Sequence, residues 1–98
     1  PGYRIKGEFS ANGVENNISH VRGAISMART QDYDGGGCQF FIMDSDCTQY
    51  DGQYAAFGNV TEGMDIVDKI CNETQVDDWQ GIVSAENQPV IKEIRVVD

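Results

Sequence analysis

The sequence has 98 residues and a mass of 10.8 kDa, which leaves room for one small domain and excludes a second core. Apolar residues make up 40% of the chain and charged residues 23%, which is ordinary for a globular protein and argues against disorder. With 16 Asp and Glu against 7 Lys and Arg, the net charge of −9 argues against nucleic acids and anionic membranes as partners.

The first residues and the cysteines indicate whether the chain is part of a longer protein and in which compartment it lies. No apolar run approaches the ~20 residues of a membrane helix, so we expect a soluble protein, and Pro1-Gly2 is more typical of a loop interior than of a natural start. We therefore expect the chain to be part of a longer sequence. Three cysteines without a Cys-x-x-Cys pair favour a cytoplasmic protein. Glycosylation sequons at Asn17, Asn59 and Asn72 leave secretion as the alternative.

Turn dipeptides at Asn12-Gly13, Asp34-Gly35 and Asp51-Gly52 punctuate the chain, because Gly accepts positive φ. Runs rich in Ile, Val, Phe or Tyr predict strands over residues 22–28, 39–43, 54–60 and 90–97. These short strands indicate a mainly antiparallel β protein, either a small sandwich or part of a barrel.

One segment, residues 61–71, shows helical spacing of its apolar residues. Thr61 is the expected N-cap, and Glu62 and Asp65 would favour the positive start of the helix. Lys69 would lie near the end, where a cation is favourable.

Several familiar motifs are incomplete. The glycines at 35–37 lack the Gly-Lys-Ser of a phosphate loop and predict a flexible loop. The acidic residues at 44, 46 and 51 lack the Glu that would complete an EF-hand and predict a solvated turn. His20 is the only histidine, which excludes a His-based metal pair, and we expect it to position the chain before the strand at Arg22. Cys38 is a candidate exposed thiol, but no local base is present to activate it, so we expect a small residue that the packing tolerates and not a nucleophile.

Three runs, at residues 22–29 (RGAISMAR), 37–42 (GCQFFI) and 51–58 (DGQYAAFG), stand in a recognisable order before the predicted helix. Their order and spacing resemble the cyclophilin-type peptidyl-prolyl isomerases, in a form similar to bacterial members. The resemblance implies a closed, mainly β antiparallel barrel, of which residues 1–98 would be the C-terminal portion of a single domain, with one helix. The family's N-terminal Phe-His-Arg, Gly-Phe-Met and Gln-Gly-Gly motifs do not occur in these residues.

The chemistry that the resemblance implies needs no nucleophile, metal or cofactor. Rotation about an X-Pro bond faces a barrier of about 18–20 kcal/mol, which an enzyme lowers by favouring the twisted amide. In the family a donor Arg in the missing segment has this role, so no catalytic residue is assigned in this chain. The resemblance implies that Arg29 would lie on the peptide-binding wall, so it is not expected to replace this donor.

The resemblance also implies a substrate-binding set. Phe41 would form the floor of a proline pocket, with Tyr50 at the place of a usual leucine and Tyr54 where histidine is often found. Strand alternation sends either Phe40 or Phe41 to the groove, and we favour Phe41. Gln39 would position the substrate. Three further residues would line the groove: Met27, Ala28 and Arg29. Gln49 stands where some members carry a tryptophan that helps bind cyclosporin, so tight binding of that drug is not expected.

The implied function is isomerisation of X-Pro bonds in proline-containing peptides or unfolded proteins, impaired in this chain alone because the donor Arg is absent. The alternative is a non-catalytic module for proline-peptide binding or scaffolding. An incomplete barrel also exposes strand edges, so the chain is a candidate for self-association or for pairing with a complementing N-terminal segment.

Overall fold

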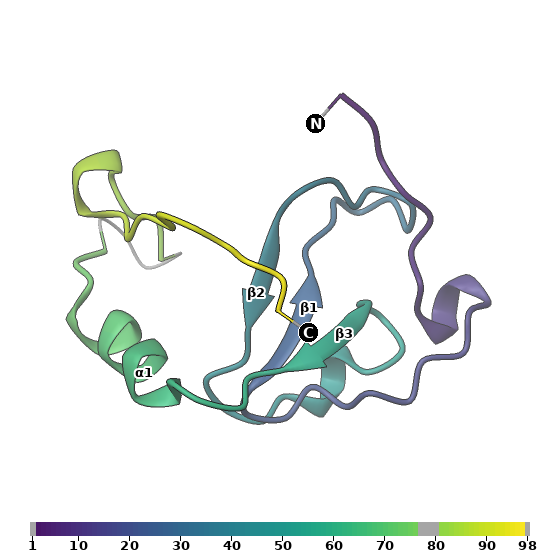
Figure 1. The fold of residues 1–98 in the computed structure, drawn as a ribbon. Helices are drawn as coiled ribbons and strands as arrows, with labels where there is room; N and C mark the ends of the chain where they lie inside the picture. Colours follow the sequence, from purple (N-terminus) through teal and green to yellow (C-terminus); the bar gives the residue numbers. More distant parts are fainter. Residues whose placement is uncertain (1, 77–80, 98) are drawn as a thin grey trace. The chain divides into compact units, whose positions relative to one another are not determined.

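The computed structural model describes residues 2–76 and 81–97 of the chain (Figure 1). The chain divides into two compact units, residues 1–64 and 65–98. None of the helices in the described residues is both long and apolar enough to cross a membrane.

The first unit is built on a three-stranded antiparallel sheet with the order β2-β1-β3 (Figure 1). Its strands are β1 (Ala24–Met27), β2 (Phe40–Ile42) and β3 (Ala56–Asn59). The first three predicted strands are confirmed, although each is shorter than its apolar run. Hydrogen bonds continue beyond the assigned ends, since Ala28 N–H donates to Gln39 O at 3.0 Å.

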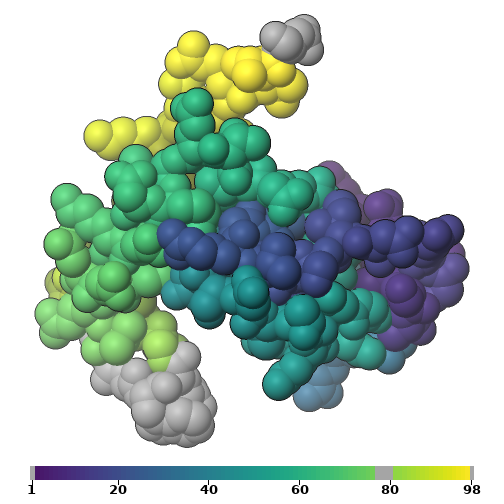
Figure 2. Space-filling view, turned by 90° about the horizontal axis from the view of Figure 1, so that it is seen from below, coloured from purple at the N-terminus to yellow at the C-terminus, as the bar shows by residue number. Residues whose placement is uncertain are grey.

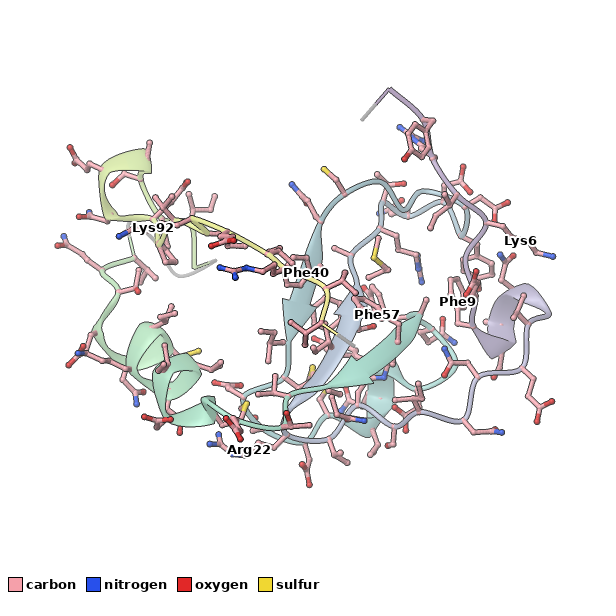
Figure 3. The ribbon with its side chains drawn as sticks, viewed as in Figure 1. Lys6, Phe9, Arg22, Phe40, Phe57 and Lys92 are labelled. Atoms are coloured by element: carbon pink, nitrogen blue, oxygen red, sulfur yellow. The ribbon has the colours of Figure 1, made fainter. Side chains whose placement is uncertain are left out.

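One face of this sheet forms the core. Ser26 of β1 lies opposite Phe41 on one side and Ala56 on the other, and paired residues share a face. Ser26 and Ala56 are buried, as are Phe9 and His20 from the preceding segment. Phe40, the neighbour of Phe41 in β2, is 39% exposed, and Figure 3 labels it on its strand. The alternation expected of a strand therefore separates the two phenylalanines.

Loops of the first unit pack against one another, as Figure 2 shows for the purple, blue and teal segments. Gly13 and Gly52 adopt φ of 82° and 77°, which confirms two of the three turn dipeptides. The Ala11 N–H donates to Gly52 O at 2.8 Å, and Ile5 forms an isolated bridge with Gly36. The N-terminal segment is thereby tied to two distant loops.

Two of the three glycines in the predicted glycine loop are packed against neighbouring residues. Gly35 and Gly36 are buried, and the Gly35 N–H donates to Asp32 O at 3.0 Å. A Cβ on Gly35 would collide with the Thr30 hydroxyl and lie 2.9 Å from Asp32 O. The absence of a side chain is therefore a packing requirement at this position.

We expect Gly35→Ala to lower the free energy of unfolding by about 1–3 kcal/mol, because the added methyl group must displace backbone. Gly2→Ala is the matched control, since a Cβ on Gly2 meets nothing within 4 Å. That control should stay within about 0.5 kcal/mol of wild type in urea unfolding. Equal free energies of unfolding for the two variants would show that the loop accommodates the added methyl group without loss of stability.

The second unit carries most of helix α1 (Met64–Glu73). The predicted helix is confirmed, but it begins three residues later, so Thr61 is not its N-cap and Glu62 precedes it. Asp65 occupies the first turn as expected, whereas the last turn holds no basic residue and Lys69 lies before it. Gly63, just before the helix, has a φ of 94°. A positive φ cannot continue a right-handed helix, and this explains the later start.

The fourth predicted strand, residues 90–97, is not formed in the described part of the chain. Its apolar composition suits a strand, but a strand also needs a neighbour to exchange hydrogen bonds with it. The closed barrel is likewise not shown, because the observed sheet is open and has three strands.

Candidate functional site

Five of the seven predicted substrate-binding residues line one open cavity of about 260 Å³. Ala28 and Arg29 follow β1, and Phe41 lies on β2. Tyr50 ends the short 3-10 helix η2 (Thr48–Tyr50), and Tyr54 follows four residues later. All five belong to the first unit. The sheet therefore supplies one wall and the η2 segment the other. We call this cavity the aromatic pocket.

The three rings of the aromatic pocket contact one another edge to face. The centroid of Phe41 lies 6.2 Å from that of Tyr50 and 5.7 Å from that of Tyr54, and the two tyrosines are 5.2 Å apart. Their interplanar angles lie between 67° and 89°. Edge-to-face pairs at these separations attract, so the rings hold each other in place. The result is a rigid apolar surface that suits a small ring such as that of proline.

His20 supports the aromatic pocket from behind. Its ring is 1% exposed and stacks on Phe41 with 6.1 Å between centroids. Tyr50 and Tyr54 meet the same ring edge to face, at 5.9 and 6.4 Å. One imidazole therefore contacts all three aromatic side chains of the pocket, a larger structural role than the sequence predicted for it.

Both ring nitrogens of His20 are paired. Nδ1 lies 2.8 Å from Asp51 Oδ1, and Nε2 lies 2.9 Å from Ser26 Oγ. A carboxylate only accepts, so we assign the proton to Nδ1 and let the Ser26 hydroxyl donate to Nε2. The hydrogen-bonded set of Ser26, His20 and Asp51 resembles a hydrolase triad. Ser26 is 0% exposed, however, so no substrate can reach its hydroxyl. The network is therefore structural.

Asp51 connects this network to the chain that carries Tyr50. Its carboxylate accepts hydrogen bonds from the Ser19 hydroxyl at 2.6 Å and from the His20 N–H at 2.7 Å, besides the imidazole. The Ser19 hydroxyl first, and then the two His20 donors, hold the pKa of Asp51 below its usual value. Because Tyr50 precedes Asp51, these bonds fix one wall of the aromatic pocket.

The low pKa of Asp51 predicts acid sensitivity. The folded pKa lies below the unfolded one, so these bonds stabilise the fold above about pH 3.9 and are lost as the pH falls through the folded pKa. We expect Asp51→Asn to be less stable than wild type at neutral pH, and the difference to shrink below about pH 4. Urea unfolding at both pH values measures it. A difference independent of pH would contradict the assignment.

Arg29 forms the rim of the aromatic pocket and is held firmly. Its guanidinium carbon lies 4.7 Å from the ring centroid of Tyr54 and 5.0 Å from those of Phe9 and Tyr33. Nε and Nη2 donate to Gln53 O at 3.0 and 2.8 Å, and Nη1 donates to a carbonyl of the next residue. These contacts leave the guanidinium poorly placed to donate to a twisted amide.

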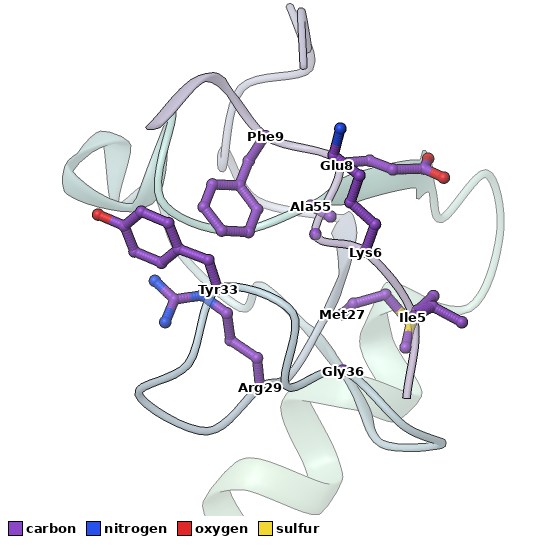
Figure 4. Close-up of a pocket in the computed structure, with 10 residues that line it drawn as sticks. Ile5, Lys6, Glu8, Phe9, Met27, Arg29, Tyr33, Gly36 and Ala55 are labelled. Atoms are coloured by element: carbon purple, nitrogen blue, oxygen red, sulfur yellow. The ribbon is translucent and has the colours of Figure 1, made fainter. Parts of the chain in front are cut away.

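The two remaining predicted residues line neighbouring cavities instead of the aromatic pocket. Gln39 lines a cavity of about 310 Å³ that shares Ala28 and Arg29 with the aromatic pocket. Met27 lines a smaller one of about 70 Å³, which also includes Arg29 (Figure 4). Three cavities therefore adjoin along the segment that follows β1.

Among the described residues, no group of three or more His, Cys, Asp or Glu side chains is arranged to hold a metal ion. None of the three cysteines is in a disulfide, and Cys38 is exposed. Asp46 accepts a hydrogen bond from the Arg22 N–H at 2.8 Å, which gives this acidic turn a structural use.

Comparison with known proteins agrees with the three sequence runs. Residues 2–98 match the family model for the cyclophilin type peptidyl-prolyl cis-trans isomerase/CLD. The chain belongs to the cyclophilin family. Four of the five residues of the aromatic pocket lie on the runs that carried the resemblance, and the fifth, Tyr50, directly precedes the third run.

Bacterial peptidyl-prolyl cis-trans isomerases are among the similar proteins. The chain is 42% identical over 66 residues to a peptidyl-prolyl cis-trans isomerase of Acinetobacter baylyi, covering 62% of this chain and 35% of that protein. Identity to isomerase A of Dickeya dadantii is 35% over 85 residues, covering 82% and 44%. Identity to isomerase B of Escherichia coli is 38% over 80 residues, covering 71% and 49%. The chain matches only about a third to a half of the length of these curated relatives.

Proposed function

We propose that this chain is part of a peptidyl-prolyl cis-trans isomerase and that its aromatic pocket receives the proline ring of an X-Pro substrate. The observation that carries the proposal is the rigid surface formed by Phe41, Tyr50 and Tyr54. Because the pocket would hold the proline ring in place, rotation would take place at the X-Pro bond that precedes the ring. The substrates are proline-containing peptides or unfolded proteins.

In this function, residues 1–98 bind the proline, and a further segment of the same domain supplies the hydrogen-bond donor. Lowering the rotation barrier takes a hydrogen-bond donor aimed at the twisted amide, worth several kcal/mol in a dry site. Arg29 is engaged with Gln53 and with aromatic rings, so it does not meet this need. We propose that residues 1–98 are the C-terminal portion of a single domain. Alone, they would bind X-Pro peptides with impaired turnover.

Exchange NMR on an Ala-Pro tetrapeptide tests this division. We expect the 98-residue chain to bind the peptide and to accelerate isomerisation weakly or not at all. A version extended at its N-terminus through a Phe-His-Arg strand taken from a bacterial relative should accelerate it strongly. Failure of both forms to bind the peptide would contradict the proposal.

A second candidate is a non-catalytic module that binds proline peptides or acts as a scaffold. The engagement of Arg29 favours it, because the aromatic pocket then lacks an available cationic donor among the described residues. This candidate predicts peptide binding without acceleration even in the extended version. The experiment above therefore separates the two.

Strand edges support a proposal about partners. In the order β2-β1-β3, the outer edges of β2 and β3 have no strand partner in the described part of the chain. Open edges are templates for pairing, so we propose that a complementing N-terminal segment or a second copy covers them. Light scattering that finds only monomer would contradict self-association.

The cytoplasmic location stays a prediction from the cysteine count.

A further inference from the structure

We propose that the cavity of about 310 Å³ beside the aromatic pocket binds an acidic side chain of the substrate, a few residues from its proline. This inference rests on the proposed function, because it assumes that a proline occupies the aromatic pocket. The two cavities share Ala28 and Arg29. A peptide seated in one therefore passes the mouth of the other. We call the larger cavity the cationic cavity.

The charged residues that line the cationic cavity are positive, although the chain as a whole is negative. Sixteen Asp and Glu residues outnumber seven Lys and Arg, yet Arg4 and Arg29 both line it and no described carboxylate does. Tyr3, Thr30 and Gln39 add neutral groups that can donate hydrogen bonds. Cations together with neutral donors match the needs of a carboxylate, which accepts several hydrogen bonds.

Arg4 is the available cation in this cavity. Within the described residues it makes no hydrogen bond or ion pair, unlike Arg29, whose guanidinium donates to backbone carbonyls. The backbone beside Arg4 is fixed, because the Ile5 N–H donates to Gly36 O at 3.0 Å. An exposed side chain on an anchored backbone can reach a ligand at a modest cost in entropy.

Two carboxylates on the neighbouring loop are already engaged. Asp34 Oδ1 accepts from the Gly7 N–H at 3.1 Å and from Asn12 Nδ2 at 2.8 Å, and the Asn12 amide, followed by Gly7, lowers the pKa of Asp34. Asp32 Oδ1 accepts from the Asp34 N–H at 2.9 Å. These two carboxylates therefore hold the loop in place. Neither of them pairs with Arg4, whose guanidinium stays available to a ligand.

Peptide affinity measured by NMR titration tests the cationic cavity. The probes are X-Pro peptides in which each position before and after proline carries Glu, Gln or Lys in turn. At one of these positions Glu should bind about fivefold more tightly than Gln, and Lys more weakly, and added salt should reduce the difference. Arg4→Gln should abolish the preference, and Arg4→Glu should reverse it towards Lys.

Lys6→Gln is the matched control, because it removes the same charge two residues away, from a side chain that does not line the cationic cavity. It should keep the preference for Glu. Equal affinity for Glu and Gln at every position, or a preference that survives Arg4→Gln, would overturn the inference while peptide binding persists. If no peptide binds, the proposed function itself fails. The two failures are thus distinguishable.

Discussion

Replacing His20 by alanine should lower the free energy of unfolding by about 3 kcal/mol, which is typical for loss of a buried ring. The ring is 1% exposed, so its removal leaves a cavity behind Phe41, Tyr50 and Tyr54. It also removes the partner of the Ser26 hydroxyl, which is fully buried. A buried hydroxyl without a partner adds a desolvation penalty. Urea unfolding followed by circular dichroism measures the change.

Ser26→Ala is the control for the His20 variant. It removes the hydroxyl that donates to the imidazole but keeps the ring, so we expect a loss of only about 1 kcal/mol. Because Ser26 and His20 are in contact, the double variant should lose less than the sum of the two single changes. A His20→Ala change of less than about 1 kcal/mol would show that the network does not stabilise the pocket.

Phe41→Ala should weaken binding of an X-Pro peptide by about tenfold or more, the usual cost of removing an aromatic anchor from a binding pocket. Phe41 contacts both tyrosines of the aromatic pocket, so its loss removes the floor and frees the two remaining rings. Peptide titration followed by NMR gives the affinity, and circular dichroism confirms that the variant remains folded.

Phe40→Ala is the matched control for this prediction. Phe40 is the adjacent residue of the same strand, and it lines neither the aromatic pocket nor the cationic cavity. Its replacement should leave peptide affinity within about twofold of wild type. Stronger weakening by Phe40→Ala than by Phe41→Ala would reverse the assignment of the two faces of β2.

The strands and the helix were predictable because their signals are local. A run such as Phe40-Phe41-Ile42 favours a strand wherever it lies, and the spacing of Met64, Val67 and Cys71 favours a helix. The start of α1 was not predictable from capping residues, because the left-handed φ of Gly63 overrides Thr61. The predicted strand over residues 90–97 is not formed among the described residues, because a strand needs a partner that its own composition does not specify.

The candidate site divides in the same way. The residues of the aromatic pocket follow from runs that resemble the family, and the structure brings five of the seven together. The supporting network was missed because Asp51 lies 31 residues from His20, a pairing that no local pattern signals. The stacking of Phe9 and Tyr33 on Arg29 was missed for the same reason. Tertiary contacts between distant segments create both features.

Titration of the 98-residue chain with an Ala-Pro tetrapeptide, followed by amide and aromatic NMR signals, tests the central claim most directly. We expect the largest shifts at Ala28, Arg29, Phe41, Tyr50 and Tyr54, with smaller ones at the His20 ring behind them. Saturable shifts confined to these residues would establish the aromatic pocket as the proline site. The absence of saturable shifts there, or binding confined to other residues, would contradict the account.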